Sequence, residues 1–268
     1  QGAPFTALTT LPAQPGATQA YADTRVTAGQ SYAYRVRAQT QAGVSDPSPA
    51  SDDVIALARP TAPRDLTATL NLQSGTIGLE WAAPSDVGGA QVIGYRIQRN
   101  TDDEGWITLT DTVGPTTSQV DESVELGREH SYRVAAVTSL GVEHLSPSSP
   151  PTGPVKAMRT PGQPNAPTVE PGPINPAQPL VRWLAPNDNG APITRYQLER
   201  HDGNAWRPHA ELPGHETQYL DQGAQPGGAY RYRVTATNDA GDSDTSSPSE
   251  PFQAHPALPA PQAPTLQH

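Results

Sequence analysis

The side chains of this sequence that could bind a metal ion are seven histidines and several short acidic clusters. His209 and His215 lie near an expected hairpin, and Asp102, Asp103 and Glu104 follow one another directly. A zinc site needs ligands at short, regular spacings, and a calcium loop needs oxygen ligands at alternating positions. Neither pattern is present, so we expect no metal site and assign the acidic residues to solvated turns.

Motifs that carry enzymatic chemistry are also missing. The sequence has no G-x-S-x-G nucleophile elbow, no H-E-x-x-H zinc motif, no phosphate-binding P-loop and no G-x-G-x-x-G dinucleotide loop. Because it contains no cysteine, it has neither disulfides nor thiolate metal ligands. We therefore expect no catalytic residues, no cofactor and no enzymatic activity.

The charge balance limits the partners. The chain carries 17 basic and 27 acidic residues, a net charge of −10, and no basic cluster, so a phosphate backbone would be repelled. No apolar run approaches the roughly 20 residues that span a bilayer. The sequence predicts neither nucleic-acid binding nor membrane insertion, and the expected partners are other proteins or surface polysaccharide.

One stretch occurs three times at intervals of about 100 residues. It reads SYAYRVRAQTQAGVSDPSP from Ser31, HSYRVAAVTSLGVEHLSPSSP from His130 and YRYRVTATNDAGDSDTSSPSEP from Tyr230. Trp81 and Trp183 repeat in the same way, 102 residues apart. A unit of about 100 residues can bury its own core, whereas a solenoid repeat of about 20 to 50 residues cannot. The sequence therefore predicts separate domains in series.

Apolar and polar residues alternate within each repeat. Tyr230, Tyr232 and Val234 fall on one face of an extended segment, and Arg231 and Arg233 fall on the other. This alternation is typical of a half-buried antiparallel strand, and prolines interrupt most windows long enough for a helix. Each unit is predicted to be an all-β sandwich of about seven short strands.

An early tryptophan followed by a turn, in WAAPSDVGGAQVIGYRIQR and WLAPNDNGAPITRYQLER, precedes the repeated Tyr-x-Val-x-Ala strand. This combination resembles the fibronectin type III domain over essentially the whole chain. The resemblance implies an immunoglobulin-like sandwich with Trp81 and Trp183 packed inside. It also implies tyrosine corners at Tyr32 and Tyr230. In such a corner the tyrosine hydroxyl makes a hydrogen bond to the backbone a few residues upstream. His130 takes this place in the middle copy, where we expect a structural substitute with a weaker corner bond.

The repeat boundaries divide the chain into four segments. Residues 1–58 are expected to form the C-terminal half of a fibronectin type III domain, 59–159 and 160–256 two complete domains, and 257–268 a proline-rich linker and the start of a further repeat. Half a sandwich exposes an apolar face and unpaired strand edges. We expect its missing strands to come from upstream sequence or from a partner chain, and the 268 residues to be a section of a longer array.

The loop after the repeated strand is a common place for binding residues in sandwich folds. Only the middle copy of this loop is notably apolar, at Leu140, Val142 and Leu145, and it contains no Arg-Gly-Asp tripeptide. These three residues are weak candidates for ligand binding. The alternative is ordinary packing at the base of the loop.

Proline-rich linkers favour an extended, semi-rigid connection between the domains. We expect a non-catalytic spacer or adhesive array in a secreted or surface-displayed multi-domain protein, located outside the cell or on its surface. The single lysine, Lys156, suggests a GC-rich genome, and we expect the multi-domain protein to be bacterial. Two alternatives are the spacer region of an extracellular polysaccharide-degrading enzyme and a phage tail or filament component of a virion. The fold alone does not choose between these functions.

Overall fold

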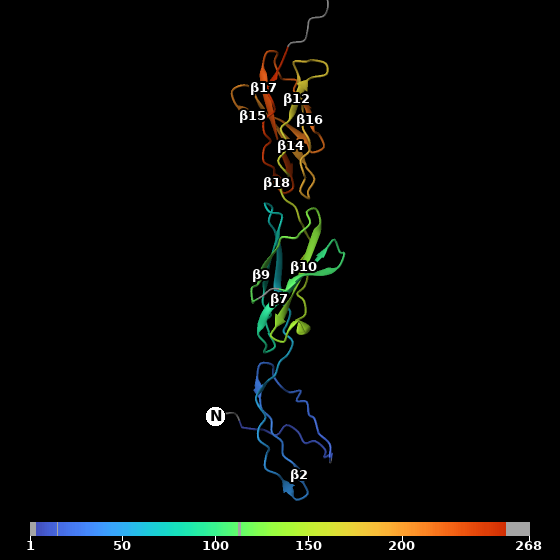
Figure 1. Cartoon of the computed structure of the whole chain (residues 1–268), viewed down its shortest axis with the longest axis vertical. Coiled ribbons are helices and arrows are strands. Elements are labelled where there is room, and N and C mark those ends of the chain that lie inside the picture. The colour runs from blue at the N-terminus through green and yellow to red at the C-terminus, as the bar shows by residue number, and fades with distance from the viewer. Residues whose placement is uncertain (1–3, 15, 112–113, 256–268) are drawn as a thin grey trace, which may run out of the picture.

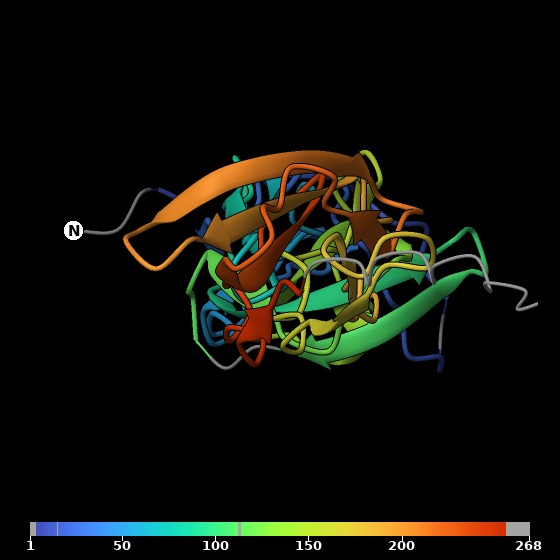
Figure 2. The ribbon, with the colours of Figure 1, turned by 90° about the horizontal axis from the view of Figure 1, so that it is seen from above.

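The structure is a computed structural model that describes residues 4–14, 16–111 and 114–255. Three units follow one another along the longest axis (Figure 1), and they project onto one another when seen from above (Figure 2). We refer to residues 4–58 as unit 1, 59–159 as domain 2 and 160–255 as domain 3. The residues 257–268, where a further repeat is expected to start, lie outside the described residues.

The described residues form β-strands and one short 3-10 turn, η1, Val142–His144. The predicted all-β fold is confirmed. In this part of the chain no helix is long and apolar enough to cross a membrane.

Domain 2 is a sandwich of a three-stranded and a four-stranded antiparallel sheet. The first sheet has the order β5 (Arg64–Leu70), β6 (Ile77–Ala82), β9 (Ser118–Asp121), and the second has the order β11 (Val155–Lys156), β10 (Glu129–Thr138), β7 (Val92–Thr101), β8 (Trp106–Asp111). These seven strands agree with the number predicted from the sequence.

Domain 3 repeats this arrangement. Its first sheet has the order β12 (Thr168–Pro171), β13 (Pro179–Arg182), β16 (Gln218–Leu220), and its second has the order β15 (Trp206–Pro213), β14 (Arg195–His201), β17 (Ala229–Asn238), β18 (Gly241–Asp242), with β19 (Phe252–Gln253) also paired to β17. The two domains therefore share the same strand order, except that β10 in domain 2 has one short partner strand on its outer side, β11, whereas β17 in domain 3 has two, β18 and β19.

Each complete domain has its own core around one tryptophan. Trp81 is buried edge-on against Tyr95, with ring centroids 5.2 Å apart, and Trp183 is buried in the same way against Tyr196 at 5.4 Å. The alternating residues of the long strands fill the remainder of each core. The prediction of two separate sandwiches with interior tryptophans is confirmed.

The chain segment that follows each long strand pairs with it through serine side chains. In domain 3 the backbone N–H of Val234 donates to Ser246 Oγ at 3.0 Å, and the N–H of Ser246 donates back to the Val234 carbonyl at 2.9 Å. The same two bonds join Val134 to Ser149. The residues that pair in this way recur at every third position, which is the period of a polyproline II helix: Ser45, Ser48 and Ser51; Ser146, Ser149 and Thr152; Ser243, Ser246 and Ser249.

Unit 1 is less regular. Its strands are β1 (Ser31–Tyr32), β2 (Gln39–Thr40), β3 (Gly43–Val44) and β4 (Val54–Ile55), paired as β1 with β4 and β2 with β3. Strands equivalent to β5, β6 and β7 do not occur among the described residues of this unit.

Candidate functional site

The segment between domains 2 and 3 is hydrogen-bonded on both sides. The Gly127 N–H donates to the Ala157 carbonyl at 2.7 Å, and the Ala157 N–H donates to the Arg128 carbonyl at 3.0 Å. Two residues later, the Arg159 N–H donates to the Asn189 carbonyl of domain 3 at 3.1 Å. This segment is therefore attached to the domain before it and to the domain after it.

The segment between unit 1 and domain 2 makes the same contacts. The Gly29 N–H donates to the Ala56 carbonyl at 2.8 Å, and the Ala56 N–H donates to the Gln30 carbonyl at 2.9 Å. The Ala58 N–H then donates to the Gly88 carbonyl of domain 2 at 2.9 Å. We call each of these two sets of contacts a junction.

Glycines meet at both junctions. Gly190 has φ +91°, and a Cβ atom there would collide with the Gly127 nitrogen and lie 2.8 Å from the Ala157 oxygen. Gly89 has φ +78°, and a Cβ there would collide with Gly29. Glycine is needed at Gly89 and Gly190 both for the left-handed backbone and for the close approach of two backbones.

The second junction has an additional contact through Asn238. The buried Asn238 amide donates to the Arg159 carbonyl at 3.0 Å and to the Asp188 carbonyl at 2.8 Å. Thr138 occupies the equivalent position at the end of β10, but its side chain has no amide group. The segment that links domains 2 and 3 is therefore held by a side chain as well as by backbone bonds.

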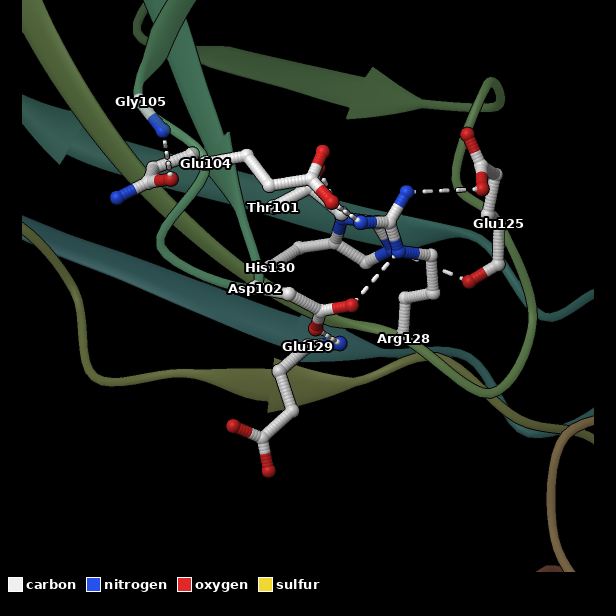
Figure 3. A network of polar contacts seen from close by, with 9 residues as sticks. Thr101, Asp102, Glu104, Gly105, Glu125, Arg128, Glu129 and His130 are labelled. Carbon is white, nitrogen blue, oxygen red and sulfur yellow. Dashed lines mark hydrogen bonds and ion pairs between the residues drawn. The ribbon is translucent and has the colours of Figure 1, made fainter.

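An arginine-centred cluster lies beside the second junction (Figure 3). Arg128 bonds to Asp102 Oδ2 at 2.7 Å, to Glu125 Oε2 at 3.2 Å and to Glu104. The bond from Arg128 holds the pKa of Asp102 below its usual value, assisted by the Glu129 N–H. The cluster joins the two turns at this end of domain 2, but its side chains are largely exposed and it adds little stability.

The other sequence-based metal candidates behave as turn or core residues. Asp102 and Asp103 have φ of +45° and +60°, as expected of turn residues. His209 Nε2 lies 3.2 Å from Asp221 Oδ1. Within the part of the chain that the structure describes, no three His, Asp or Glu side chains come together as metal ligands.

The tyrosine corners occur at the predicted residues. Tyr32 Oη accepts a hydrogen bond from the Thr27 N–H at 2.8 Å, and Tyr230 Oη accepts one from the Gln225 N–H at 2.9 Å. In both cases the amide lies five residues upstream. Each bond ties the turn before the long strand to that strand.

His130 forms a different corner. Its Nδ1 lies 3.0 Å from Thr101 Oγ1 and its Nε2 lies 3.2 Å from the Glu125 carbonyl oxygen (Figure 3). The fully buried imidazole thus bonds at both nitrogens and reaches the carbonyl five residues upstream instead of the amide. The structure differs here from the expected weakened corner, because the ring gains a second partner on β7.

Sequence reasoning missed a buried carboxylate in domain 3. Asp221 accepts bonds from Arg200 Nη1 at 2.8 Å and Tyr232 Oη at 2.7 Å, with His209 at 3.2 Å. Burial alone would raise the pKa of Asp221, but the contact with His209 and the bonds from Arg200 and Tyr232 outweigh it and hold the pKa well below its usual range. The group stays charged at neutral pH, and its role is structural.

Domain 2 repeats this carboxylate with Asp121. Arg99 Nη1 donates to Asp121 at 2.8 Å and Tyr132 Oη donates at 3.0 Å. The signal available in the sequence was the regular spacing: the two aspartates lie 100 residues apart and Arg99 and Arg200 lie 101 apart.

The predicted apolar loop lies at the other end of domain 2. Val142 is exposed, and Leu140 and Leu145 are half-buried. The Ser139 N–H donates to the Gln91 carbonyl at 2.8 Å, so the loop lies close to the turn that meets unit 1. Ligand binding by these residues stays a prediction.

Comparison with known proteins identifies the family. The sequence profile described as "Fibronectin type III domain" matches residues 61–152 and 162–252. Over 239 residues the chain is 28% identical to "M-protein, striated muscle" of Gallus gallus, covering 83% of this chain and 16% of the relative. Over 115 residues it is 30% identical to "Cell adhesion molecule-related/down-regulated by oncogenes" of Xenopus laevis, covering 42% of this chain and 9% of the relative.

These curated relatives are animal proteins, which gives no support to a bacterial source, and the chain spans less than a fifth of their length. Among solved structures, a two-domain fibronectin type III segment from chicken tenascin aligns with a TM-score of 0.42 and 17% identity, covering 71% of this chain and 98% of that one. Since the family profile matches well over half of the residues in two consecutive blocks, the chain belongs to the fibronectin type III family.

Proposed function

We propose that the chain is a non-catalytic section of a multi-domain protein, in which its domains act as a semi-rigid spacer or adhesive array. The observation that carries the proposal is the repeated junction, with the same backbone bonds and the same glycine contact at two places. A flexible linker would not need two opposed glycines at each joint. Fixed joints keep a binding surface at a set distance from its anchor.

A location outside the cell or on its surface is part of this proposal. The name of the Xenopus relative supports it, whereas the name of the Gallus relative points to muscle. Protease treatment of intact cells that make the native full-length protein distinguishes a surface location from an intracellular one. Digestion on intact cells is expected, and protection until the cells are permeabilised would contradict this location. The bound partner would be another protein or a surface polysaccharide.

The test of the spacer function is the geometry of the second junction. The chain has no cysteine, so exposed Ile107 and Ile174 can be changed to cysteine and spin-labelled in the full chain. We expect a narrow distance distribution between the labels. Gly190→Val should broaden it, because the valine side chain would separate Gly190 from Gly127.

Gly203→Val is the matched control. Gly203 has φ +94°, close to that of Gly190, but a Cβ there would meet nothing within 4 Å. The control should therefore carry the same backbone strain and leave the distribution narrow. A wild-type distribution as broad as that of Gly190→Val would contradict the spacer proposal.

A further inference from the structure

The second junction contains a peptide bond with a chemistry of its own. Asn189–Gly190 is the only Asn-Gly pair in the sequence. In such a pair the backbone nitrogen of the glycine can attack the side-chain carbonyl carbon of the asparagine, because glycine has no side chain to obstruct the ring that forms. The ring is a succinimide, and water opens it to aspartate or isoaspartate. The pair is therefore a place where the chain could modify itself.

The closed junction holds the groups that would react. Asn189 is only 8% exposed, and its Nδ2, the atom that would leave as ammonia, donates to the Thr160 carbonyl at 2.7 Å. The backbone carbonyl of Asn189 accepts the Arg159 N–H at 3.1 Å. The attacking nitrogen, that of Gly190, donates its proton to Asp188 Oδ1 at 3.1 Å. Ring closure requires both residues of the pair to rotate, and these bonds oppose the rotation.

The glycine contact between the domains opposes the same rotation. A Cβ on Gly190 would collide with the Gly127 nitrogen, so the two backbones already touch. Asn189 has a left-handed backbone, with φ +50°, and is fixed between this contact and the linking segment. The pair is therefore held from both sides for as long as domains 2 and 3 stay together.

The first junction makes the same backbone bond without this chemistry. Gly88 stands there in the place of Asn189, and it accepts the Ala58 N–H at 2.9 Å as Asn189 accepts the Arg159 N–H. Glycine has no side-chain amide to lose. The backbone geometry of a junction thus needs only glycine at this position, and Asn189 adds an amide that binds the linking segment and is also able to leave.

We propose that Asn189–Gly190 is a deamidation site whose reaction is controlled by opening of the second junction. When the two domains separate, the Gly190 nitrogen loses its proton to hydroxide and forms a bond to Asn189 Cγ. The Cγ–Nδ2 bond breaks, and ammonia leaves with a proton taken from water. Water then adds to one of the two ring carbonyls and opens the succinimide, with no oxidation or reduction.

The products no longer fit the closed junction. Aspartate has carboxylate oxygens in place of the Nδ2 donor, and they repel the Thr160 carbonyl oxygen. In isoaspartate the main chain runs through the β-carbon, which adds one carbon to the backbone beside the contact of Gly190 with Gly127. Each product also carries a new negative charge. We therefore expect each reaction to follow an opening of the joint and to loosen that joint permanently.

The first experiment measures the mass of the proteolytic fragment that contains Asn189 after incubation of the unchanged chain at mildly alkaline pH. A synthetic peptide of residues 185–193 gives the rate of the same reaction without the junction. We expect the unchanged chain to react at least about tenfold more slowly than the peptide, because its reaction requires local opening. An isoaspartate-specific methyltransferase identifies the second product.

Gly127→Val weakens the junction from the side of domain 2 and leaves residues 185–193 unchanged. Its Cβ would lie 3.5 Å from Gly190 Cα, so the methyl groups beyond it would push against Gly190. We expect Asn189 to deamidate at least about fivefold faster than in the unchanged chain. Gly227→Val is the matched control and should not change the rate. Gly227 holds the same place in domain 3, with φ +83° against +90° for Gly127, and a Cβ there would meet nothing within 4 Å.

Asn238→Thr is a second way to weaken the junction, since it removes the bond to the Arg159 carbonyl. Equal deamidation rates in the unchanged chain, Gly127→Val and Asn238→Thr would overturn the proposal. A rate in the unchanged chain equal to that of the peptide would overturn it as well, because the closed junction would then give Asn189 no protection.

The second experiment tests the consequence for the joint. The deamidated chain carries an additional negative charge, so anion exchange separates it from the unreacted chain. With spin labels at Ile107 and Ile174 it should show a broader distance distribution than the unreacted chain. Asn189→Gly, which copies Gly88 of the first junction, should not react, and incubation should leave its distribution unchanged. A deamidated chain with the distribution of the unreacted one would contradict the loosening.

The two readouts separate this inference from the spacer proposal. A narrow distance distribution in a chain whose Asn189 reacts as fast as the peptide would overturn the inference alone. A broad distribution in a chain whose Asn189 is protected would overturn the spacer proposal alone.

Discussion

At the scale of single residues, the most consequential groups are the two carboxylates buried beneath tyrosine. Asp121 and Asp221 each join the first sheet of a sandwich to an arginine and a tyrosine of the second. Burial of the carboxylate is offset by these bonds, so removing it leaves an arginine without its partner. Such a group contributes to stability only while it is charged.

Asp221→Asn should therefore destabilise domain 3 by about 3 kcal/mol at pH 7. The pKa of Asp221 is lowered on folding, so its contribution is complete above the unfolded value of about 4 and declines as the pH falls toward the folded value. The measurement is urea unfolding between pH 7 and pH 3, with hydrogen exchange of β14 and β17 as the readout of domain 3. On acidification Asp221→Asn should lose less stability than the unchanged chain. The exposed Asp239→Asn is the control, and an equally steep loss in Asp221→Asn would contradict the assignment.

At the scale of elements, the strand alternation and the tryptophan spacing were sufficient to predict two complete sandwiches. The serine-bonded edge was missed. Its residues look like an ordinary turn-rich segment, because serine and proline at a period of three match neither a strand nor a helix. What the sequence does not display is that Ser246 Oγ takes the place of a backbone acceptor for Val234.

Ser246→Ala tests this edge. The Val234 N–H would be left buried without an acceptor, and we expect domain 3 to lose about 1–3 kcal/mol of unfolding free energy. Ser247→Ala removes an exposed hydroxyl from the next residue and should change stability by less than about 0.5 kcal/mol. Equal urea midpoints for the two variants would show that water replaces the serine hydroxyl.

At the scale of the whole molecule, the array depends on contacts that sequence reasoning could place only in part. Prolines predicted a semi-rigid linker, but the backbone bonds of the junctions use N–H and C=O groups, which every residue except proline supplies in full. The glycines at Gly29, Gly89, Gly127 and Gly190 were the available signal. Their pairing across domains required coordinates, because each lies in a turn that would favour glycine in any case.

The two junctions should differ in stiffness because of Asn238. Asn238→Thr gives domain 3 a threonine in place of the junction amide, as Thr138 does in domain 2. We expect the spin-label distance between domains 2 and 3 to broaden, though less than in Gly190→Val, since the backbone bonds remain. Asn204→Thr changes an exposed turn residue and should have no effect. A distribution as narrow as that of the unchanged chain would show that the amide does not stiffen the joint.

The pairing of β11 with β10 determines how domain 2 would respond to tension. Glu129 pairs with Lys156 and His130 with Val155 in antiparallel register, and the Gly127 and Ala157 bonds continue the same ladder. Bonds of this kind run across the strands, so a pull along the array loads them together in shear and does not open them one by one. We therefore expect the last strand before each junction to resist extension, so that the array carries force before its cores unfold.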